Sequence, residues 1–430
     1  MRARHFTVEP GQVQATAEAV RALVDSTVDV AATVAGILAA VREHGDGAVL
    51  ELTRRFDSDA APALMRVAPE RLDEALAGLD PDVRVGLDTG ISNVRRVAEA
   101  EPADDVAVEL PEGHTVTLRD LPVARAGVYV PGGRAAYPSS VVMCCVPARV
   151  AGVERLAVAT PPGADGRGND LILAACRLCH VEEVHLMGGA QAVAALAYGT
   201  ASVAPVDVVV GPGNAYVQEA KRQLAGLVGI DSIAGPTELL VIADAGADAT
   251  VVALDLAAQA EHGPDSLVAV ASPDAALLEA VAEAAAGLAA ERPTIQDAPL
   301  ALVRTPDLDA AVELANAFAP EHLELACADA GRLAGRVTAA GCVFVGGGAA
   351  FGDYAAGSNH VLPTGGAARF SGPLGASTFR RRQALVSLPG SAARALAPHV
   401  SSVARAEGFP VHAESAEARA RSPHESGDHG

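Results

Sequence analysis

The amino-acid sequence predicts an α/β protein with two lobes, each built on a parallel sheet. Short apolar runs such as Arg155–Ala159, Glu183–Met187 and Val206–Val210 are each followed by glycine or proline and then by a helical pattern. The same alternation resumes after Gly235-Pro236, with further runs near Leu239–Ala243. Strands that alternate with helices indicate parallel sheets, because two parallel strands need a crossover connection.

The order of the expected elements divides the chain into domains. Residues 13–56 and 69–100 show the apolar spacing of helices, Val106–Leu121 alternates as strands do, and Arg380–Arg405 is expected to be helical. The expected parts are a helical N-terminal segment at 1–25, a discontinuous α/β domain at 26–128 and 239–375, an inserted α/β domain at 129–238, a helical C-terminal segment at 376–415 and a disordered tail at 416–430.

The length and net charge of the chain indicate which kinds of partner it can bind. The chain has 430 residues, is 50% hydrophobic and carries a formal net charge of -21. This length and hydrophobic content are enough for more than one buried core. The negative charge disfavours nucleic-acid phosphates and anionic membrane surfaces. We therefore expect no nucleic acid and no membrane as partners, and a small zwitterionic or cationic ligand instead.

Neither the N-terminus nor the longest uncharged stretch indicates export or membrane insertion. Met1–Gly11 contains Arg2, Arg4 and Glu9 and no apolar run, so no secretory signal is predicted and a cytoplasmic location is expected. Leu186–Val206 has no formal charge, but it contains glycines and a proline that do not suit a bilayer helix. We assign it to a buried α/β core.

The six cysteines do not indicate a disulfide framework in a chain of this length. Cys176-Arg-Leu-Cys179-His180 matches the attachment string of haem c. Haem attachment requires export, however, and the pair lies in an apolar helical pattern. Reduced cysteines in the core are favoured over a haem or a redox pair.

A glycine-rich turn suggests a nucleotide site. Val206–Val210 runs into Gly211-Pro212-Gly213-Asn214 and then a helical pattern, which places backbone N–H groups where an anion could bind. The third glycine of the Rossmann fingerprint would fall at Tyr216, so the dinucleotide fingerprint is incomplete. Turns at Pro131-Gly132-Gly133 and Gly188-Gly189 would share the same sheet edge. Spacing alone favours a structural turn over an NAD site.

Candidate metal ligands are scattered over the second half of the chain. Gln259 and His262 lie three positions apart in a helical pattern, so both side chains would face the same way, although such pairs are also common on surface helices. Asp353 follows a glycine-rich stretch, and His360 and His412 lie further on. Any zinc must be assembled from distant segments with mixed N and O ligands, which is typical of catalytic sites.

Glu321 and His322 are the candidate proton-transfer pair. They are adjacent in Pro320-Glu321-His322-Leu323-Glu324 and can both exchange protons near neutral pH. Adjacent residues need not point the same way. An acidic surface loop is the alternative interpretation.

Six ordered strings carry a resemblance to a known family. They are Val128-Tyr129-Val130-Pro131-Gly132-Gly133, Gly188-Gly189-Ala190-Gln191-Ala192, Gly211-Pro212-Gly213-Asn214-Ala215-Tyr216, Gln259-Ala260-Glu261-His262, Pro320-Glu321-His322-Leu323, and Gly352-Asp353-Tyr354 through Asn359-His360. On these strings the sequence resembles the histidinol dehydrogenase family over residues 10–415. The resemblance implies two Rossmann-like lobes in an intertwined homodimer.

The resemblance also implies an activity and the residues that serve it. The activity is the NAD-dependent oxidation of L-histidinol to L-histidine through bound L-histidinaldehyde, the last steps of histidine biosynthesis, with one zinc ion per subunit and two NAD consumed per turnover. The implied zinc ligands are Gln259, His262, Asp353 and His412, the last supplied by the partner subunit. The implied substrate contacts are Thr237, Gln259, His262, Glu321, His322, Asp353, His360, Glu407 and His412. The implied NAD contacts are Tyr129, Gln191 and Asn214.

The implied chemistry assigns a role to each group. Zinc would hold the imidazole and amino nitrogens of the substrate and so fix its carbinol carbon against the nicotinamide. His322 would act as general base, and Glu321 would activate the water that adds to the aldehyde before the second hydride leaves.

The sequence departs from the family pattern at several positions. Thr237 stands where serine is usual and keeps the hydroxyl, and Cys144 replaces asparagine. The loop before Gly352 is shortened and lacks a Pro-Glu pair, and Gly263 follows the metal histidine.

Two other interpretations stay open. One is a relative that oxidises another alcohol, such as a sulfonated propanediol. The other is a metal-binding or scaffold protein without catalysis. Glu407 and His412, together with the intact Glu321-His322 pair, favour histidinol.

Overall fold

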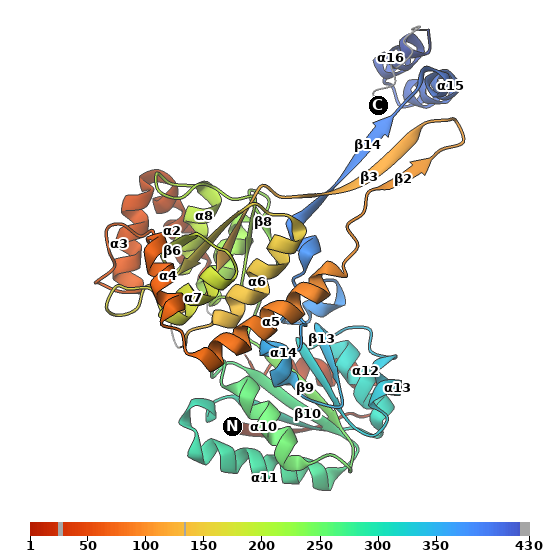
Figure 1. Cartoon of the computed structure of the whole chain (residues 1–430). Helices are drawn as coiled ribbons and strands as arrows, with labels where there is room; N and C mark the ends of the chain where they lie inside the picture. Colours follow the sequence, from red (N-terminus) through yellow and green to blue (C-terminus); the bar gives the residue numbers. More distant parts are fainter. Residues whose placement is uncertain (25–28, 133–134, 422–430) are drawn as a thin grey trace. The chain divides into compact units, whose positions relative to one another are not determined.

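The computed structural model describes residues 1–24, 29–132 and 135–421. The chain forms two compact units. The first unit consists of Met1–Glu101 and Val123–Phe379, and the second of Pro102–Pro122 and Arg380–Gly430. The expected α/β class with two parallel sheets is confirmed, and both parallel sheets lie in the first unit (Figure 1).

One lobe of the first unit is a five-stranded parallel sheet in the order β6-β5-β4-β7-β8. Its strands are β4 (Arg125–Tyr129), β5 (Arg155–Thr160), β6 (Glu183–Leu186), β7 (Val208–Val210) and β8 (Gly229–Ile230). The connecting helices are α6 (Pro138–Ala151), α7 (Asp170–Leu178), α8 (Gly189–Tyr198) and α9 (Ala215–Leu224). Most side chains of β4 to β7 are buried, because helices cover both faces of such a sheet.

The other lobe is a six-stranded parallel sheet in the order β1-β11-β10-β9-β12-β13. Its strands are β1 (Arg2–Thr7), β9 (Glu238–Ala243), β10 (Leu267–Ser272), β11 (Pro299–Arg304), β12 (His322–Ala326) and β13 (Cys342–Val345). The accompanying helices are α1 (Val13–Arg21), α10 (Ala249–Ala260), α11 (Ala275–Glu291), α12 (Leu308–Phe318), α13 (Ala330–Ala334) and α14 (Ala349–Tyr354).

The two sheets repeat one topology. Apart from β1 at the edge, each sheet places its first strand in the middle, its second and third strands on one side and its fourth and fifth on the other. The order reverses between β4 and β7 in one sheet and between β9 and β12 in the other. In open α/β sheets such a reversal opens a crevice for ligands.

The helices that precede the five-stranded sheet pack onto its own helices. They are α2 (Ala31–His44), α3 (Asp46–Phe56), α4 (Pro69–Ala77) and α5 (Pro81–Glu99), and their neighbours are α6, α7, α8 and α9. This packing differs from the expected division of the chain, in which 26–128 joined 239–375. The apolar face of an amphipathic helix is compatible with either sheet, so the sequence did not distinguish between them.

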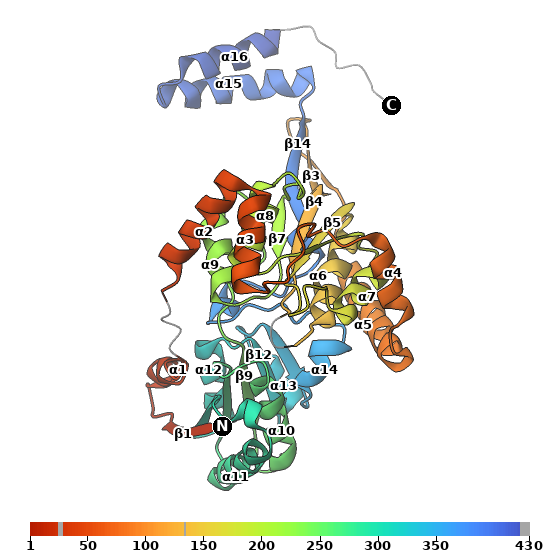
Figure 2. The same ribbon diagram turned by 90° about the vertical axis from the view of Figure 1, so that its left-hand side faces the viewer.

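The second unit joins two segments that are distant in the sequence. β2 (Val106–Glu109), β3 (Thr115–Pro122) and β14 (Arg380–Ser387) form an antiparallel sheet in the order β14-β3-β2. α15 (Gly390–Ala406) packs against α16 (Pro410–Arg421), and Arg405 pairs with Glu417 at 2.7 Å (Figure 2).

Three expectations about the chain ends were wrong. Residues 2–7 of the expected N-terminal helical segment form β1, which pairs with β11. Residues 380–387 of the expected C-terminal helical segment form β14, which pairs with β3. Both are mostly exposed strands whose partners are distant, so pairing decides their conformation. Residues 416–421 of the expected disordered tail belong to α16, and 422–430 lie outside the described residues.

Among the described residues, no helix is long and apolar enough to cross a membrane. The stretch Leu186–Val206 consists of the end of β6, the buried helix α8 and a loop. Its assignment to the α/β core is confirmed.

Candidate active site

The predicted proton-transfer pair lies at the amino end of β12. α12 ends at Phe318, and Ala319 then takes a left-handed conformation with φ of 49°. Glu321 and His322 follow directly and are 7% and 3% exposed. The alternative of an acidic surface loop is therefore wrong.

Glu321 is held by the residues that begin β9. Thr237 Oγ1 and the Glu238 N–H both donate to Glu321 Oε2, the latter at 2.8 Å, and His322 Nδ1 lies 3.6 Å from the same oxygen. Burial alone would raise the pKa of Glu321, but the charge of His322 and these hydrogen bonds outweigh burial and lower that pKa. In this structure the Thr237 hydroxyl therefore serves Glu321.

His322 shows the opposite shift. Burial alone would lower its pKa, but the charges of Glu321 and Asp353 and the hydrogen bonds outweigh burial and raise that pKa. Asp353 Oδ1 lies 3.8 Å from His322 Nε2. Glu321 and His322 thus favour the carboxylate and the imidazolium in each other's presence.

Other predicted side chains gather around His322. Gln259 Nε2 lies 3.4 Å from His322 Nδ1. His360 Nδ1 lies 2.9 Å from the Asp353 carbonyl oxygen and 4.0 Å from its Oδ1. Burial lowers the pKa of His360, and the charges of His322 and His262 lower it further. The structure thus brings together segments that are far apart in the sequence.

The helical prediction for Gln259 and His262 was only half right. α10 ends at Ala260, so Gln259 is in its last turn and His262 lies beyond the helix. His262 Nδ1 approaches the Gln259 carbonyl oxygen at 3.2 Å. The two residues are neighbours because the chain turns at the helix end, and Gly263 follows directly.

The chemistry of this donor set fits a zinc ion of the mixed N and O kind. Gln259 offers an amide oxygen, His262 an imidazole and Asp353 a carboxylate, all from the first unit. Over the described ranges, no three His, Cys, Asp or Glu side chains are arranged to hold a metal ion. A glutamine in the set and a fourth ligand from elsewhere are consistent with that finding.

Glu407 and His412 belong to the second unit. Glu407 is the C-cap residue of α15, and His412 lies in α16 with its ring 5.4 Å from that of Phe409. Both predicted residues are exposed within their unit.

Asp353 is carried by α14, a short helix that follows three glycines. Gly346, Gly347 and Gly348 have φ of 91°, 99° and 98°, which suits glycine alone without strain. Glu324 lies beneath this turn, and its Oε2 is 3.5 Å from the Ala349 N–H. The shortened loop therefore ends on a buried carboxyl group of β12.

The predicted NAD residues lie at the carboxyl edge of the five-stranded sheet. Tyr129 ends β4, and its hydroxyl accepts the Gly189 N–H at 3.2 Å. Gln191 is buried in α8, and Asn214 caps α9 by accepting the N–H groups of the second and third residues after it. A Cβ at Gly211 would lie 2.1 Å from the Tyr129 carbonyl oxygen. The turns at Gly188-Gly189 and Gly211–Asn214 thus share one edge, as expected, while Gly133 of the third turn lies outside the described residues.

Asp57 adjoins the predicted NAD residues and was not predicted from the sequence. Asp57 Oδ2 accepts the Gly188 N–H at 3.2 Å and the Gln191 amide at 3.1 Å. Burial raises the pKa of Asp57 to about 6, although both hydrogen bonds oppose the rise. Its place after α3 gives no signal in the sequence.

Glu238, at the other sheet, was also not predicted. Its Oε1 accepts from Arg21 at 2.5 Å and from the Gly365 N–H at 3.2 Å. Burial raises the pKa of Glu238 to about 7 despite Arg21, and the charge of Glu321 adds to the rise. A glutamate that opens the apolar run Leu239–Ala243 was the available signal.

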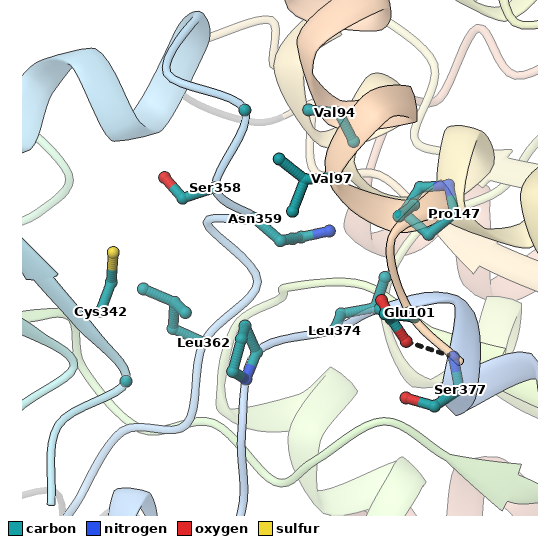
Figure 3. A pocket seen from close by; sticks show the side chains of 15 residues that line it. Val94, Val97, Glu101, Pro147, Cys342, Ser358, Asn359, Leu362, Leu374 and Ser377 are labelled. Carbon is teal, nitrogen blue, oxygen red and sulfur yellow. Dashed lines mark hydrogen bonds between the residues drawn. The ribbon is translucent and has the colours of Figure 1, made fainter.

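A separate pocket of about 360 Å³ lies behind the strand that carries Cys342 (Figure 3). Its wall is largely apolar, with Val94, Val97, Leu362 and Leu374 among the lining residues. None of the predicted site residues lines it.

Four of the six cysteines lie in the core, and Cys327 and Cys342 are half-buried. Cys144, Cys145, Cys176 and Cys179 are buried, and burial raises the pKa of each thiol. The expected placement of Cys176 and Cys179 in the core is confirmed by their burial.

Two lobes of repeated α/β topology, with a buried glutamate-histidine pair in one, define an α/β protein whose site is equipped for proton transfer. The family model of histidinol dehydrogenase matches residues 21–420. The chain belongs to the histidinol dehydrogenase family.

Individual relatives agree with this assignment. Histidinol dehydrogenase of Cereibacter sphaeroides is 45% identical over 384 residues, which is 87% of this chain and 88% of the relative. That of Thermobifida fusca is 46% identical over 381 residues, 86% of this chain and 87% of the relative. A crystal structure of histidinol dehydrogenase from Elizabethkingia anophelis superposes with a TM-score of 0.90 at 28% identity, covering 97% and 98% of the two chains.

Proposed function

We propose that the protein oxidises L-histidinol to L-histidine in two steps, through bound L-histidinaldehyde, with NAD as the oxidant. The main supporting observation is the buried Glu321-His322 pair, surrounded by Gln259, Asp353 and His360. An amide, a carboxylate and imidazoles around a proton-transfer pair suit a substrate that itself carries an imidazole and an amine.

The chain's own groups supply the proton transfers. His322, in its neutral form, takes the proton of the carbinol hydroxyl as hydride leaves the carbon. Glu321 keeps Oε2 on the hydrogen bonds from Thr237 and Glu238, and Oε1 is the oxygen that we assign to the attacking water. Burial excludes bulk water from the pair, which protects the aldehyde between the two steps.

Two groups that are not part of the chain, a zinc ion and NAD, would complete the site. Gln259, His262, Asp353 and, from the second unit, His412 would hold zinc, which supplies a Lewis acid that orients substrate nitrogens. Tyr129, Gln191 and Asn214 would contact NAD, which accepts the hydride. Both assignments rest on the resemblance and on the placement of these residues.

The assembly forms part of the proposal. We propose a homodimer in which His412 and Glu407 reach the site of the partner subunit. Both side chains are exposed in their own unit, which leaves them free to serve a second copy. A cytoplasmic location without nucleic-acid or membrane partners also remains an expectation.

The decisive measurement is the NADH formed per L-histidinol consumed by purified, zinc-loaded protein. Two NADH per substrate with histidine as product is the expected result. One NADH would indicate that the aldehyde is released and that the second step fails. If no NADH forms, the proposed substrate is wrong and the protein oxidises another alcohol. A sulfonated propanediol would be tested next.

A further inference from the structure

Lys221 is the only lysine of the chain. Lysine and arginine together number 32, and the other 31 are arginines. Lys221 is also the largest of the fully buried side chains. A sequence that uses arginine for every other basic side chain has kept an ammonium group at one position in the interior. Because burying a charge is costly, this position calls for a specific reason.

The ammonium group makes two polar contacts, one with the turn at Gly211 and one with Asp231. Lys221 Nζ donates to the Gly211 carbonyl oxygen at 3.1 Å and forms an ion pair with Asp231. Asp231 Oδ2 in turn accepts the Gly211 N–H at 2.8 Å. One ion pair therefore holds the peptide groups on both sides of Gly211.

Gly211 opens the turn that precedes Asn214. Its φ is 115°, and a side chain there would bring its Cβ to 2.1 Å from the Tyr129 carbonyl oxygen, so both facts require glycine at this position. The turn thus packs directly on the backbone of Tyr129. A displacement of Gly211 would shift both Asn214 and Tyr129.

The helix that follows the turn is fixed at both ends. Asn214 caps the start of α9, and Lys221 reaches back from its last turns to Gly211. Gln218, between them, donates to the Gly213 carbonyl oxygen at 3.4 Å and accepts the Ala234 N–H at 2.9 Å. Asn214, Gln218 and Lys221 of this region therefore each make a polar contact at the turn Gly211–Asn214 or at the helix start that follows it.

We propose that Lys221 and Asp231 are positioning residues for the cofactor, which hold the turn Gly211–Asn214 and Tyr129 in the conformation that binds NAD. This inference rests on the proposed function, because it takes NAD as the ligand of this edge. The ammonium is a compact charge with three donors, whereas a guanidinium is wide, planar and forked. An arginine at 221 would not fit between Gly211 and Asp231 without displacing the turn.

The single lysine offers a direct test. Protein labelled with ¹⁵N-lysine should give one backbone amide signal, that of Lys221, and titration with NAD in the absence of histidinol should shift it. An unshifted signal would contradict the inference. The same sample is then assayed for turnover of histidinol. Turnover with an unshifted signal would leave the proposed function standing and contradict only the inference on Lys221, whereas no turnover would contradict the proposed function as well.

Variants test the positioning role itself. Lys221→Arg keeps the charge, and the double variant Lys221→Met with Asp231→Asn removes both charges while keeping an acceptor for the Gly211 N–H. Each should raise KM for NAD at least about tenfold and leave KM for histidinol within about twofold. The adjacent, exposed Arg222→Met is the control and should change neither.

The outcomes separate the alternatives. A merely structural role would lower the melting temperature or the fraction of active enzyme without a selective change in KM for NAD. Folded variants with an unchanged KM for NAD would overturn the inference even if the wild type forms two NADH per histidinol. If the variants do not fold, the NAD titration of the labelled wild type decides.

Discussion

Thr237 and Glu321 are 84 positions apart, yet one hydrogen bond joins them. With the Glu238 N–H, this bond fixes one oxygen of the carboxylate beside His322. The proximity of the two groups matters, because the Glu321 carboxylate stabilises the His322 imidazolium and the imidazolium keeps the carboxylate ionised. A pair arranged in this way can hold a proton on one member and accept a proton on the other.

At this scale we predict that Glu321→Gln slows the conversion of L-histidinaldehyde by roughly 10²–10⁴-fold, the usual contribution of a general base. The amide keeps the acceptor for Thr237, so zinc content and folding should be retained. Steady-state rates with the aldehyde, alongside zinc analysis, check this. The exposed Glu313→Gln on α12 is the control. Full activity on the aldehyde would remove Glu321 from the mechanism.

Single residues differed in how far the sequence could place them. Glu321 and His322 were visible as neighbours, but their burial depends on β9 and β13 on either side of β12. His262 was assigned to a helical face although the helix ends before it. Asp57 was missed because a lone acid after a helix gives no pattern, and Glu238 was missed although it opens an apolar run. Their environment is created by distant segments.

Among the elements, α14 begins over a pair of acidic side chains, of which Glu324 is buried and Asp255 is half-buried. Glu324 of β12 lies beside Asp255 of α10 and under the first turn of α14. Burial, followed by the charge of Asp255, raises the pKa of Glu324 to about 8. The folded protein therefore prefers Glu324 protonated at neutral pH, with its hydroxyl free to donate to Asp255.

The sign of the pH dependence follows from this shift. The pKa of Glu324 is higher in the folded than in the unfolded chain, so its stabilising contribution is complete below about pH 4.5 and is lost as pH rises towards about 8. Glu324→Gln mimics the protonated form at every pH. We predict that it leaves stability nearly unchanged at pH 4.5 and raises the free energy of unfolding by on the order of 1–2 kcal/mol at pH 9.

Thermal or urea unfolding at both pH values measures the difference. The exposed Glu313→Gln should show no such dependence on pH. A Glu324→Gln protein that is equally destabilised at pH 4.5 and pH 9 would mean that the amide disturbs the turn before α14. Protonation of Glu324 would then not be what stabilises this turn.

Elements with strong apolar runs were predictable, including β6 at a sheet edge, whereas β1, β12 and β14 were not. β7 and β9 are buried throughout, and the sequence marks them as apolar runs that end in a turn. β12 contains the buried Glu324, which interrupts the pattern, and β1 and β14 carry exposed polar side chains. Their strand conformation comes from partners that the local sequence does not reveal.

On the scale of the whole molecule, the predicted site residues lie at opposite edges of the two sheets. Tyr129, Gln191 and Asn214 follow the carboxyl ends of their strands, where α/β sheets usually bind ligands. Thr237 and Glu321 instead precede β9 and β12, at the amino ends. The fold class therefore indicates the edge at which the first set lies, whereas the residues of that set came from the family resemblance. Of the second set, Glu321 was identified from its chemistry beside His322, and Thr237 came from the resemblance.

The second unit supplies the prediction that tests assembly. His412→Asn should lower zinc content and activity by at least about tenfold while the dimer persists, because the ion loses one ligand but the apolar contacts of the unit remain. Metal analysis and light scattering on the same sample check both parts. His399→Asn is a matched control, since His399 is an exposed histidine of α15 in the same unit. Unchanged zinc content would refute His412 as a ligand.

The path of the chain between the two units has a mechanical consequence. The chain crosses from one unit to the other after Glu101, after Pro122 and after Phe379. A protease that cut either of the first two crossings would leave α15 and α16 covalently joined to the body of the enzyme through β14. A cut at the third would free 380–430 from the backbone, but β14 would still be paired along its whole length with β3, which stays in the larger fragment. The helices that carry Glu407 and His412 are thus tethered twice, once by the backbone and once by a strand pairing, and should stay attached after a single nick at any crossing.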